Sequence, residues 1–340
     1  MNKGHRLYRE DISNILSVKG VDELRGKSFL VTGATGMVGV MLIDALMALG
    51  DVKVIAVGRS KDKAKERLGE YFDNTNFEFL EHDVCAPFPK DIIVDYIIPM
   101  ASNTHPLAYS KYPVETMMIN LKGAEHALNL AESTGATVIY TSTNEVYGNA
   151  VSDEVFDEDS NGKLNLGNAR ACYNESKRSA EAMCQSYKTE RGVKVKIIRL
   201  CRIFGPTMLM TDTKASSQFI QKAVVGEDIV LKSNGMQFFS YIYVADAVMG
   251  LITVLLNGEY GMAYNVSSER TNVHLRDFAR LCAEYNGKSV VYDIPDATEQ
   301  AGYSIATQAI LSNERIKQIG FIPQYDMEDA VKRTIEILRD

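Results

Sequence analysis

The sequence contains only five cysteines in 340 residues, and no two of them stand in a C-x-x-C pair. Zinc sites and redox dithiols need closely spaced cysteines, so we predict buried free thiols and no metal site. A long run of Lys and Arg is also missing, and Asp plus Glu outnumber Lys plus Arg by 44 to 37. Because this charge pattern does not neutralise a phosphate backbone, we expect no nucleic-acid partner.

The N-terminal residues lack a long apolar run, since charged side chains interrupt the stretch MNKGHRLYREDISNIL. A signal peptide or a membrane span requires such a run, so we expect a cytoplasmic protein with no membrane partner. Glycine and proline are also sparse, at 24 and 8 positions, while 46% of the residues are apolar. This composition excludes a disordered or collagen-like chain and predicts a folded protein.

Short apolar segments alternate with helical patterns over the first two thirds of the chain. We expect strands at 28–32, 52–57, 77–80, 96–100, 138–141 and 195–200, and helices at 37–49, 61–72, 112–134 and 173–191. Near-continuous apolar strands that alternate with helices predict an α/β fold with a doubly wound parallel sheet, covered by helices on both faces.

The alternation weakens after Gly205, which predicts a smaller C-terminal α/β lobe. Residues 1–26 are expected to form a helical extension, because apolar residues recur there at helical spacing. The stretch 238–257 is apolar enough to be buried, so we expect it to return to the first lobe. Short strands at 229–231, 263–266 and 290–292 are assigned to the second lobe.

A glycine-rich turn, TGATGMVG, follows the first expected strand and opens the first helix of the alternating pattern. Glycines permit a tight turn there and let the backbone approach a pyrophosphate at the helix N-terminus. The turn therefore predicts a dinucleotide site, and a ligand-free glycine turn is the alternative. The candidate cofactor-binding residues in this turn are Gly33, Thr35, Gly36, Met37, Val38 and Gly39.

The end of the second expected strand lacks the acidic residue that often binds the ribose 2′-hydroxyl group, and carries Arg59 instead. A guanidinium group could contact a 2′-phosphate, which makes NADP an alternative to NAD. A solvated arginine without a ligand is the other interpretation.

Tyr173 and Lys177 stand four residues apart, on one face of an expected helix. A nearby ammonium group lowers the pKa of a phenol, which makes tyrosine usable as a base. This pattern alone is common, but Ser142-Thr143-Asn144-Glu145 ends an apolar strand, and ligands bind at the carboxyl ends of parallel strands. We therefore predict that Thr143, Tyr173 and Lys177 form a catalytic group.

These motifs resemble the extended short-chain dehydrogenase/reductase family of nucleotide-sugar epimerases, dehydratases and decarboxylases over residues 27–338. The matching segments are TGATGMVG, His82-Asp83-Val84, TSTNEVYG, the pair Tyr173 and Lys177, and the closing segment GFIPQYDMEDAVKRTIEIL. The resemblance implies an NAD(P)-binding Rossmann domain at 27–204 and a mainly substrate-binding lobe at 205–340. It also implies cofactor contacts by Asp83, Val84, Ala101, Tyr173 and Lys177, and a homodimer through helices 112–134 and 173–191.

Within this family the chain resembles UDP-glucuronate decarboxylases most. The segments concerned are Ala108-Tyr109, Pro113-Val114-Glu115-Thr116, Arg170-Ala171-Cys172-Tyr173 and Gly205-Pro206-Thr207-Met208. The resemblance implies that Tyr173 takes the C4 hydroxyl proton of a nucleotide sugar while Thr143 holds the oxygen. The resulting 4-keto sugar acid loses carbon dioxide, and the nicotinamide is recycled. A 4-epimerase and a 4,6-dehydratase share the first step and remain alternatives, as does an NAD(P)-sensing module without turnover.

The resemblance also implies substrate contacts. Glu145 corresponds to the family's catalytic glutamate beside the reacting end of the sugar, and Arg170 could attract a carboxylate or be a surface charge. Asn144 replaces the aspartic acid of 4,6-dehydratases, which argues against that reaction because an amide does not act as the acid. Arg202 and Phe239 replace the family's usual Asn and Arg, so we predict that Arg202 binds the diphosphate. Further candidate substrate contacts are His105 and Gln218.

Overall fold

A seven-stranded parallel sheet forms the centre of the larger lobe in the computed structural model, which describes residues 1–104, 106–148, 154–294 and 307–340. In spatial order its strands are β11 (Ala263–Val266), β7 (Lys194–Leu200), β5 (Thr137–Thr143), β4 (Tyr96–Pro99), β1 (Ser28–Thr32), β2 (Lys53–Gly58) and β3 (Phe77–Glu81). All neighbouring strands pair in parallel. The predicted α/β fold with a doubly wound parallel sheet is confirmed.

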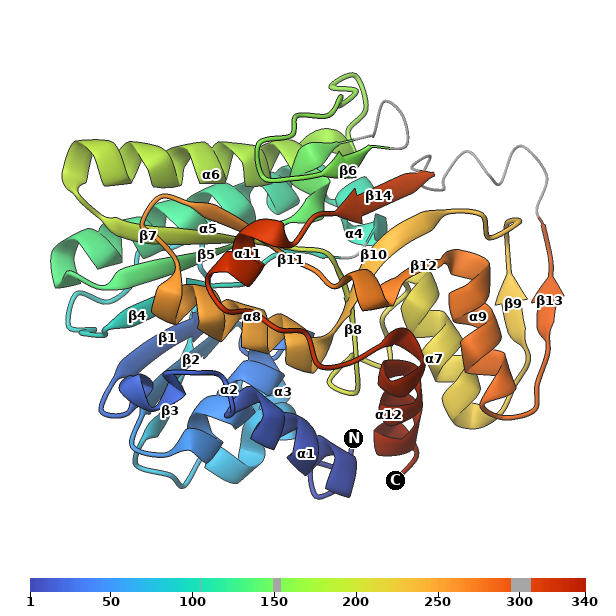
Figure 1. Cartoon of the computed structure of the whole chain (residues 1–340). Coiled ribbons are helices and arrows are strands. Elements are labelled where there is room, and N and C mark those ends of the chain that lie inside the picture. The colour runs from blue at the N-terminus through green and yellow to red at the C-terminus, as the bar shows by residue number, and fades with distance from the viewer. Residues whose placement is uncertain (105, 149–153, 295–306) are drawn as a thin grey trace.

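Helices cover both faces of this sheet (Figure 1). One face carries α5 (Pro113–Thr134) and α6 (Ala171–Arg191), and the other carries α2 (Met37–Leu49), α3 (Lys61–Leu68) and α8 (Val244–Asn257). On β1, Phe29 and Val31 pack into the core with α2 and α8, whereas Leu30 between them packs into the core with α5 and α6. Successive strand side chains point to opposite faces, so a continuously apolar strand builds both cores at once.

A second sheet of five strands, within the described residues, forms the centre of the smaller lobe. Its strands are β12 (Asn272–His274), β10 (Phe238–Tyr243), β14 (Gln308–Leu311), β6 (Val155–Phe156) and β8 (Arg202–Phe204); β9 (Ile229–Leu231) and β13 (Val290–Tyr292) pair separately. Apart from α8, the helices described after β8 are α7 (Ala215–Val225), α9 (Leu275–Glu284), α11 (Glu314–Gln318) and α12 (Met327–Arg339). The short helix α4 (Pro106–Lys111) precedes α5 in the first lobe.

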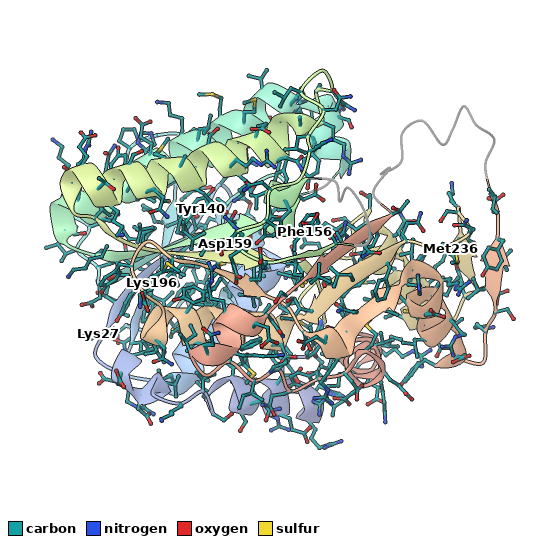
Figure 2. The ribbon with its side chains drawn as sticks, turned by 45° about the horizontal axis from the view of Figure 1, so that its top comes forward. Lys27, Tyr140, Phe156, Asp159, Lys196 and Met236 are labelled. Carbon is teal, nitrogen blue, oxygen red and sulfur yellow. The ribbon has the colours of Figure 1, made fainter. Side chains whose placement is uncertain are left out.

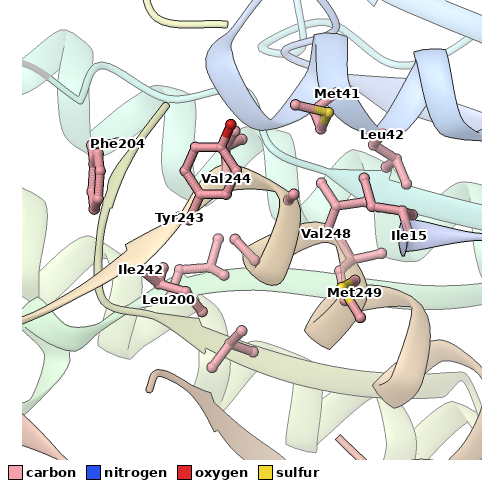
Figure 3. Packing of buried hydrophobic residues seen from close by; sticks show 14 of the residues in the cluster. Ile15, Met41, Leu42, Leu200, Phe204, Ile242, Tyr243, Val244, Val248 and Met249 are labelled. Carbon is pink, nitrogen blue, oxygen red and sulfur yellow. The ribbon is translucent and has the colours of Figure 1, made fainter. Parts of the chain in front are cut away.

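The N-terminal segment is part of the packed structure. Its helix α1 (Arg6–Ile15) lies against α2 and α8, and Figure 3 shows Ile15, Met41 and Val248 converging where these helices meet. Asp11 is fully buried and accepts hydrogen bonds from Tyr243 at 2.5 Å, and from two residues near the C-terminus. The two ends of the chain are thereby joined around one buried carboxylate.

Two segments lie elsewhere than the sequence analysis expected. Of the stretch 238–257, only α8 packs on the first sheet, whereas β10 belongs to the second sheet. Strand β11, which we assigned to the second lobe, is instead the edge strand of the first sheet, where Ala263 pairs with Ile197. The reason is that α8 ends beside β7, and the short connection after it places the next strand along that edge.

All five cysteines are free, and four of them are buried. Cys85 is the partly exposed one. No helix among the described residues is long and apolar enough to cross a membrane.

Candidate active site

The glycine turn between β1 and α2 leaves the start of the helix accessible to a ligand. Gly33 has a φ of +65°, and a Cβ atom there would lie 2.9 Å from the backbone of Met100. A Cβ on Gly39 would lie 2.5 Å from the Gly33 carbonyl oxygen. Gly36 is the N-cap of α2, and no side chain of the described residues caps the helix there. The backbone N–H groups of the first turn are therefore available to an anion such as a pyrophosphate.

The other candidate cofactor residues line the same edge of the sheet. The Thr32 hydroxyl accepts hydrogen bonds from the backbone N–H groups of Met100 and Ala101, both at 3.0 Å, which holds Ala101 beside the glycine turn. Asp83 and Val84 follow β3, and the Asp83 carboxylate accepts a hydrogen bond from the Cys85 N–H at 2.9 Å. This arrangement fits an extended dinucleotide that runs from the ends of β2 and β3 to the end of β5.

Arg59 follows β2 and has an ionic partner that the sequence did not indicate. Its guanidinium group lies 3.5 Å from the carboxylate of Glu115 in α5, and the two side chains are 62% and 48% exposed. A surface pair of this kind contributes about 0–1 kcal/mol. Arg59 is therefore weakly held rather than locked.

Thr143, Glu145 and Tyr173 converge where β5 ends and α6 begins. The Glu145 N–H donates to the Thr143 hydroxyl at 3.3 Å. Burial raises the pKa of Tyr173, the charge of Glu145 raises it further, and the nearby Thr143 hydroxyl lowers it. The strand end and the helix start thus bring a hydroxyl, a carboxylate and a phenol together.

Lys177 lies one helical turn after Tyr173, but its ammonium group points toward β5. It donates to the Thr141 carbonyl at 2.8 Å and lies 5.1 Å from the centre of the Tyr140 ring. Burial lowers the pKa of Lys177 to about 8. We expected Lys177 to lower the pKa of Tyr173; the pKa is raised instead, because burial of the phenol is the largest contribution.

Tyr140 itself is fully buried between the sheet and the α5/α6 layer (Figure 2). Its hydroxyl group has no hydrogen-bond partner among the described residues. A small, mostly apolar cavity beside it is also lined by three polar side chains, those of Thr32 in β1, Asn120 in α5 and Lys177 in α6. The cavity therefore joins the end of β1 to the catalytic candidate Lys177.

Two residues next to the catalytic candidates were not predicted as site residues, although Tyr109 stands in a segment that carries the decarboxylase resemblance. Asn174 donates from its amide nitrogen to the backbone carbonyl and to the carboxylate of Glu145, at 2.8 and 3.1 Å. The Tyr109 ring stacks on Tyr173 with centroids 4.7 Å apart and an angle of 15°. The only local signal for Asn174 in the sequence was its position directly after Tyr173.

The candidate substrate residues come from both lobes. Asn144 is buried, and its amide oxygen accepts from the Thr143 hydroxyl at 3.5 Å. Arg170 is the N-cap residue of α6. Burial raises the pKa of Tyr109, and the charge of Arg170 offsets part of that rise, so Arg170 lies near the Tyr109–Tyr173 stack. His105 lies outside the described residues.

Arg202 reaches the edge of this site from the second sheet. Thr143 pairs with Leu200 across β5 and β7, and Arg202 lies two residues further along the chain, at the start of β8. Its guanidinium carbon lies 3.7 Å from the centre of the Phe239 ring, and Nη1 is buried without a hydrogen-bond partner among the described residues. A guanidinium nitrogen without a partner can donate a hydrogen bond to an anionic ligand.

Gln218 does not have a buried, unpartnered nitrogen like that of Arg202. It is an exposed residue of α7, and its amide donates to the Thr213 carbonyl at 2.8 Å. No group of three or more His, Cys, Asp or Glu residues in the described part of the chain could hold a metal ion.

Comparisons with known proteins show the family of this chain. Residues 29–267 match the NAD dependent epimerase/dehydratase family. UDP-glucuronic acid decarboxylase 1 of Xenopus tropicalis is 32% identical over 328 residues, which cover 95% of this chain and 74% of that protein. The protein of the same name from Danio rerio is 33% identical over 325 residues, 94% of this chain and 74% of its own.

Among solved structures, the UDP-glucuronic acid 4-epimerase of Bacillus cereus in complex with UDP-glucuronic acid and NAD is similar in fold. The TM-score is 0.80 at 18% identity, and the match covers 92% of this chain and 98% of the other.

Proposed function

The chain belongs to the NAD dependent epimerase/dehydratase family, and from this premise we propose that it decarboxylates UDP-glucuronate to UDP-xylose through a 4-keto intermediate. The observation that carries the proposal is the convergence of Thr143, Glu145 and Tyr173 in a chain that is 32% identical to a UDP-glucuronic acid decarboxylase. Asn144 supports decarboxylation over dehydration, since it offers no acidic proton.

NAD is the cofactor that we propose, held by the backbone of the glycine turn, by Asp83, Val84 and Ala101, and by Lys177 and Tyr173 at the reacting end. The open first turn of α2 and the close backbone approach at Gly39 support this placement. When bound, a nicotinamide supplies the acceptor and later the donor of a hydride.

The remaining steps of the reaction are assigned to side chains of this chain. Tyr173 accepts the C4 hydroxyl proton, and Thr143 positions the C4 oxygen through the hydroxyl that already contacts Tyr173. The C4 ketone lies β to the C6 carboxylate, so the bond to carbon dioxide can break with its electrons delocalised into the carbonyl. C5 must then take up one proton, which comes from solvent. We propose that Glu145, which the resemblance places beside the reacting end of the sugar, binds this proton and passes it to C5.

Two arginines are proposed to bind the negative charges of the substrate. Arg202 would take the diphosphate, which the buried and unpartnered Nη1 supports. Arg170 would take the sugar carboxylate, supported by its position beside the Tyr109–Tyr173 stack. We also propose a homodimer through α5 and α6, a proposal that rests on the family resemblance.

NADP stays an alternative because Arg59 could contact a 2′-phosphate. One observation favours NAD: Glu115 already pairs with Arg59, and a dianionic phosphate would have to displace this carboxylate.

The test is incubation of the purified protein and NAD with UDP-glucuronate, UDP-glucose, UDP-N-acetylglucosamine and dTDP-glucose, with products identified by mass spectrometry and NMR. Loss of carbon dioxide from UDP-glucuronate is the expected result. Inversion at C4 without a change of mass would assign an epimerase, loss of water a dehydratase, and no turnover of any sugar a binding module.

A second experiment tests the diphosphate site. Replacing Arg202 with methionine keeps much of the stacking on Phe239 but removes the charge, so KM for UDP-glucuronate should rise by about 10-fold or more with kcat little changed. Arg270, an exposed arginine of the same lobe that pairs with Asp326, serves as the control position. An unchanged KM in Arg202→Met would contradict the assignment.

A further inference from the structure

Asn174 is a buried residue of α6, 7% exposed, and its amide contacts the 3₁₀ turn Asn144–Tyr147 that carries Glu145. Its amide nitrogen donates to both the backbone carbonyl of Glu145, at 2.8 Å, and the carboxylate Oε2 of the same residue, at 3.1 Å. A carboxamide nitrogen carries two hydrogens, so both bonds can form at once. One side chain therefore fixes both the main chain and the side chain of Glu145.

The same helix holds the turn at another point. Arg178, one helical turn after Asn174, donates to the carbonyl of Val146 at 2.6 Å. On the other side of the turn, the Glu145 N–H is bound by the Thr143 hydroxyl. The turn is thus attached to α6 through two consecutive carbonyls and to the end of β5 through an N–H group.

This attachment has a geometric consequence. Asn174 directly follows Tyr173 on α6, so one rigid helix sets the positions of both the phenol and the Glu145 carboxylate. With Oε2 held by the amide, the side chain loses its rotamer freedom before substrate arrives, and Oε1 is the oxygen left to act. A carboxylate that must take up a proton from solvent and pass it to one carbon of the sugar needs such a fixed orientation.

We propose that Asn174 is a positioning residue that orients the Glu145 carboxylate for the decarboxylation and reprotonation half of the reaction, and not for the hydride-transfer half. The proposal rests on the proposed function, because it assigns a step to that reaction. The amide of Asn174 directs Oε1 toward the sugar, whereas Tyr173 and Thr143 serve the C4 oxygen and receive no hydrogen bond from that amide.

The substitution Asn174→Asp separates hydrogen bonding from packing. Aspartate has nearly the shape of asparagine, but it lacks the two amide hydrogens. Beside Glu145 it has at most the one proton that two neighbouring carboxyl groups share, so it cannot donate to both the Glu145 carbonyl and Oε2. The matched control is Asn313→Asp. Asn313 is also buried, and its amide likewise donates to a backbone carbonyl and a glutamate carboxylate, those of Ser267 and Glu269 in the second lobe.

Each variant is assayed with NAD and UDP-glucuronate labelled at the carboxyl carbon, and two rates are compared. Absorbance of the reduced nicotinamide reports hydride transfer, and labelled carbon dioxide reports decarboxylation. We expect Asn174→Asp to slow carbon dioxide release by about 10–100-fold while hydride transfer changes less than about threefold. Asn313→Asp should leave the ratio of the two rates unchanged. Equal slowing of both rates in Asn174→Asp, a shifted ratio in Asn313→Asp, or a normal ratio in both would overturn the proposal.

Crystal structures of the wild type and Asn174→Asp give a readout that needs no turnover. Glu145 should occupy one orientation in the wild type and a different one, or several, in the variant; an unchanged orientation would also overturn the proposal. If the wild type releases no carbon dioxide from UDP-glucuronate, the proposed function fails, and the crystal structures alone then decide whether Asn174 positions Glu145.

Discussion

Replacing Gly39 with alanine should weaken NAD binding, because its added methyl group would meet backbone atoms and not flexible side chains. The new Cβ would lie 2.5 Å from the Gly33 oxygen and 2.8 Å from the Ala34 oxygen. Carbon and oxygen atoms in non-bonded contact normally stay more than about 3 Å apart, so the glycine turn must move. That turn is the proposed pyrophosphate site.

The size of the effect follows from two opposing contributions. Gly39 lies inside α2, where alanine is favoured over glycine by about 1 kcal/mol. Overpacking a close contact costs about 1–3 kcal/mol. Because the displaced turn is the proposed pyrophosphate site, this cost can weaken the free energy of NAD binding. If this whole cost appears in binding, the Kd for NAD rises by roughly 5- to 150-fold.

Gly26→Ala is the control, since Gly26 has a φ of +72° but no atom within 4 Å of an added Cβ. It should cost about 1–2 kcal/mol of stability, a shift of the Tm by only about 1–3 °C in a chain of this length, without any change in NAD affinity. Thermal unfolding and calorimetric titration with NAD measure both quantities. If Gly39→Ala binds NAD within about threefold of the wild type and unfolds no earlier, the argument from close backbone approach is wrong.

The remaining predictions concern the catalytic residues and the cofactor. Tyr173→Phe keeps the aromatic ring but removes the proton acceptor, so turnover of UDP-glucuronate should fall by about 10²–10⁴-fold with NAD affinity retained; product assays and titration check this. Burial lowers the pKa of Lys177 from 10.5 to about 8, so the folded protein loses this proton before the unfolded chain does. The stability of the wild type relative to Lys177→Met should therefore rise between pH 8 and 10.5, by up to about 3 kcal/mol, and a pH-independent difference in urea unfolding would contradict this. Glu115→Gln releases Arg59 from an exposed pair, so NADP binding should improve relative to NAD by up to about fivefold, and an unchanged ratio in competition titrations would show that Arg59 does not face the 2′ position.

The strands and the glycine turn were predictable because their signals are local. Strand β1 spans Ser28–Thr32 as expected, and α2 spans Met37–Leu49. Apolar residues at strand and helix spacing decide which segments are buried, and glycine is required where a backbone passes close to another. The pairing of Tyr173 with Lys177 on one helix face likewise depends only on helical geometry.

The partners of these residues were not predictable from the sequence. Glu145 lies 29 positions before the amide that holds it, Arg59 lies 56 positions before its carboxylate partner, and β11 was assigned to the wrong lobe. The direction of the Tyr173 pKa shift also depends on how deeply the fold buries the phenol.

Periodicity and short motifs are properties of neighbouring residues, so the amino-acid sequence was enough to predict the layered α/β architecture, the position of the glycine turn and the candidates for catalysis. Three contacts became evident from the fold alone: Asn174 holds Glu145, Arg202 lies on Phe239 with a nitrogen unpaired within the described residues, and Lys177 turns toward Thr141. Those contacts join surfaces far apart along the chain, and which surfaces meet is set by the packing of whole helices and strands.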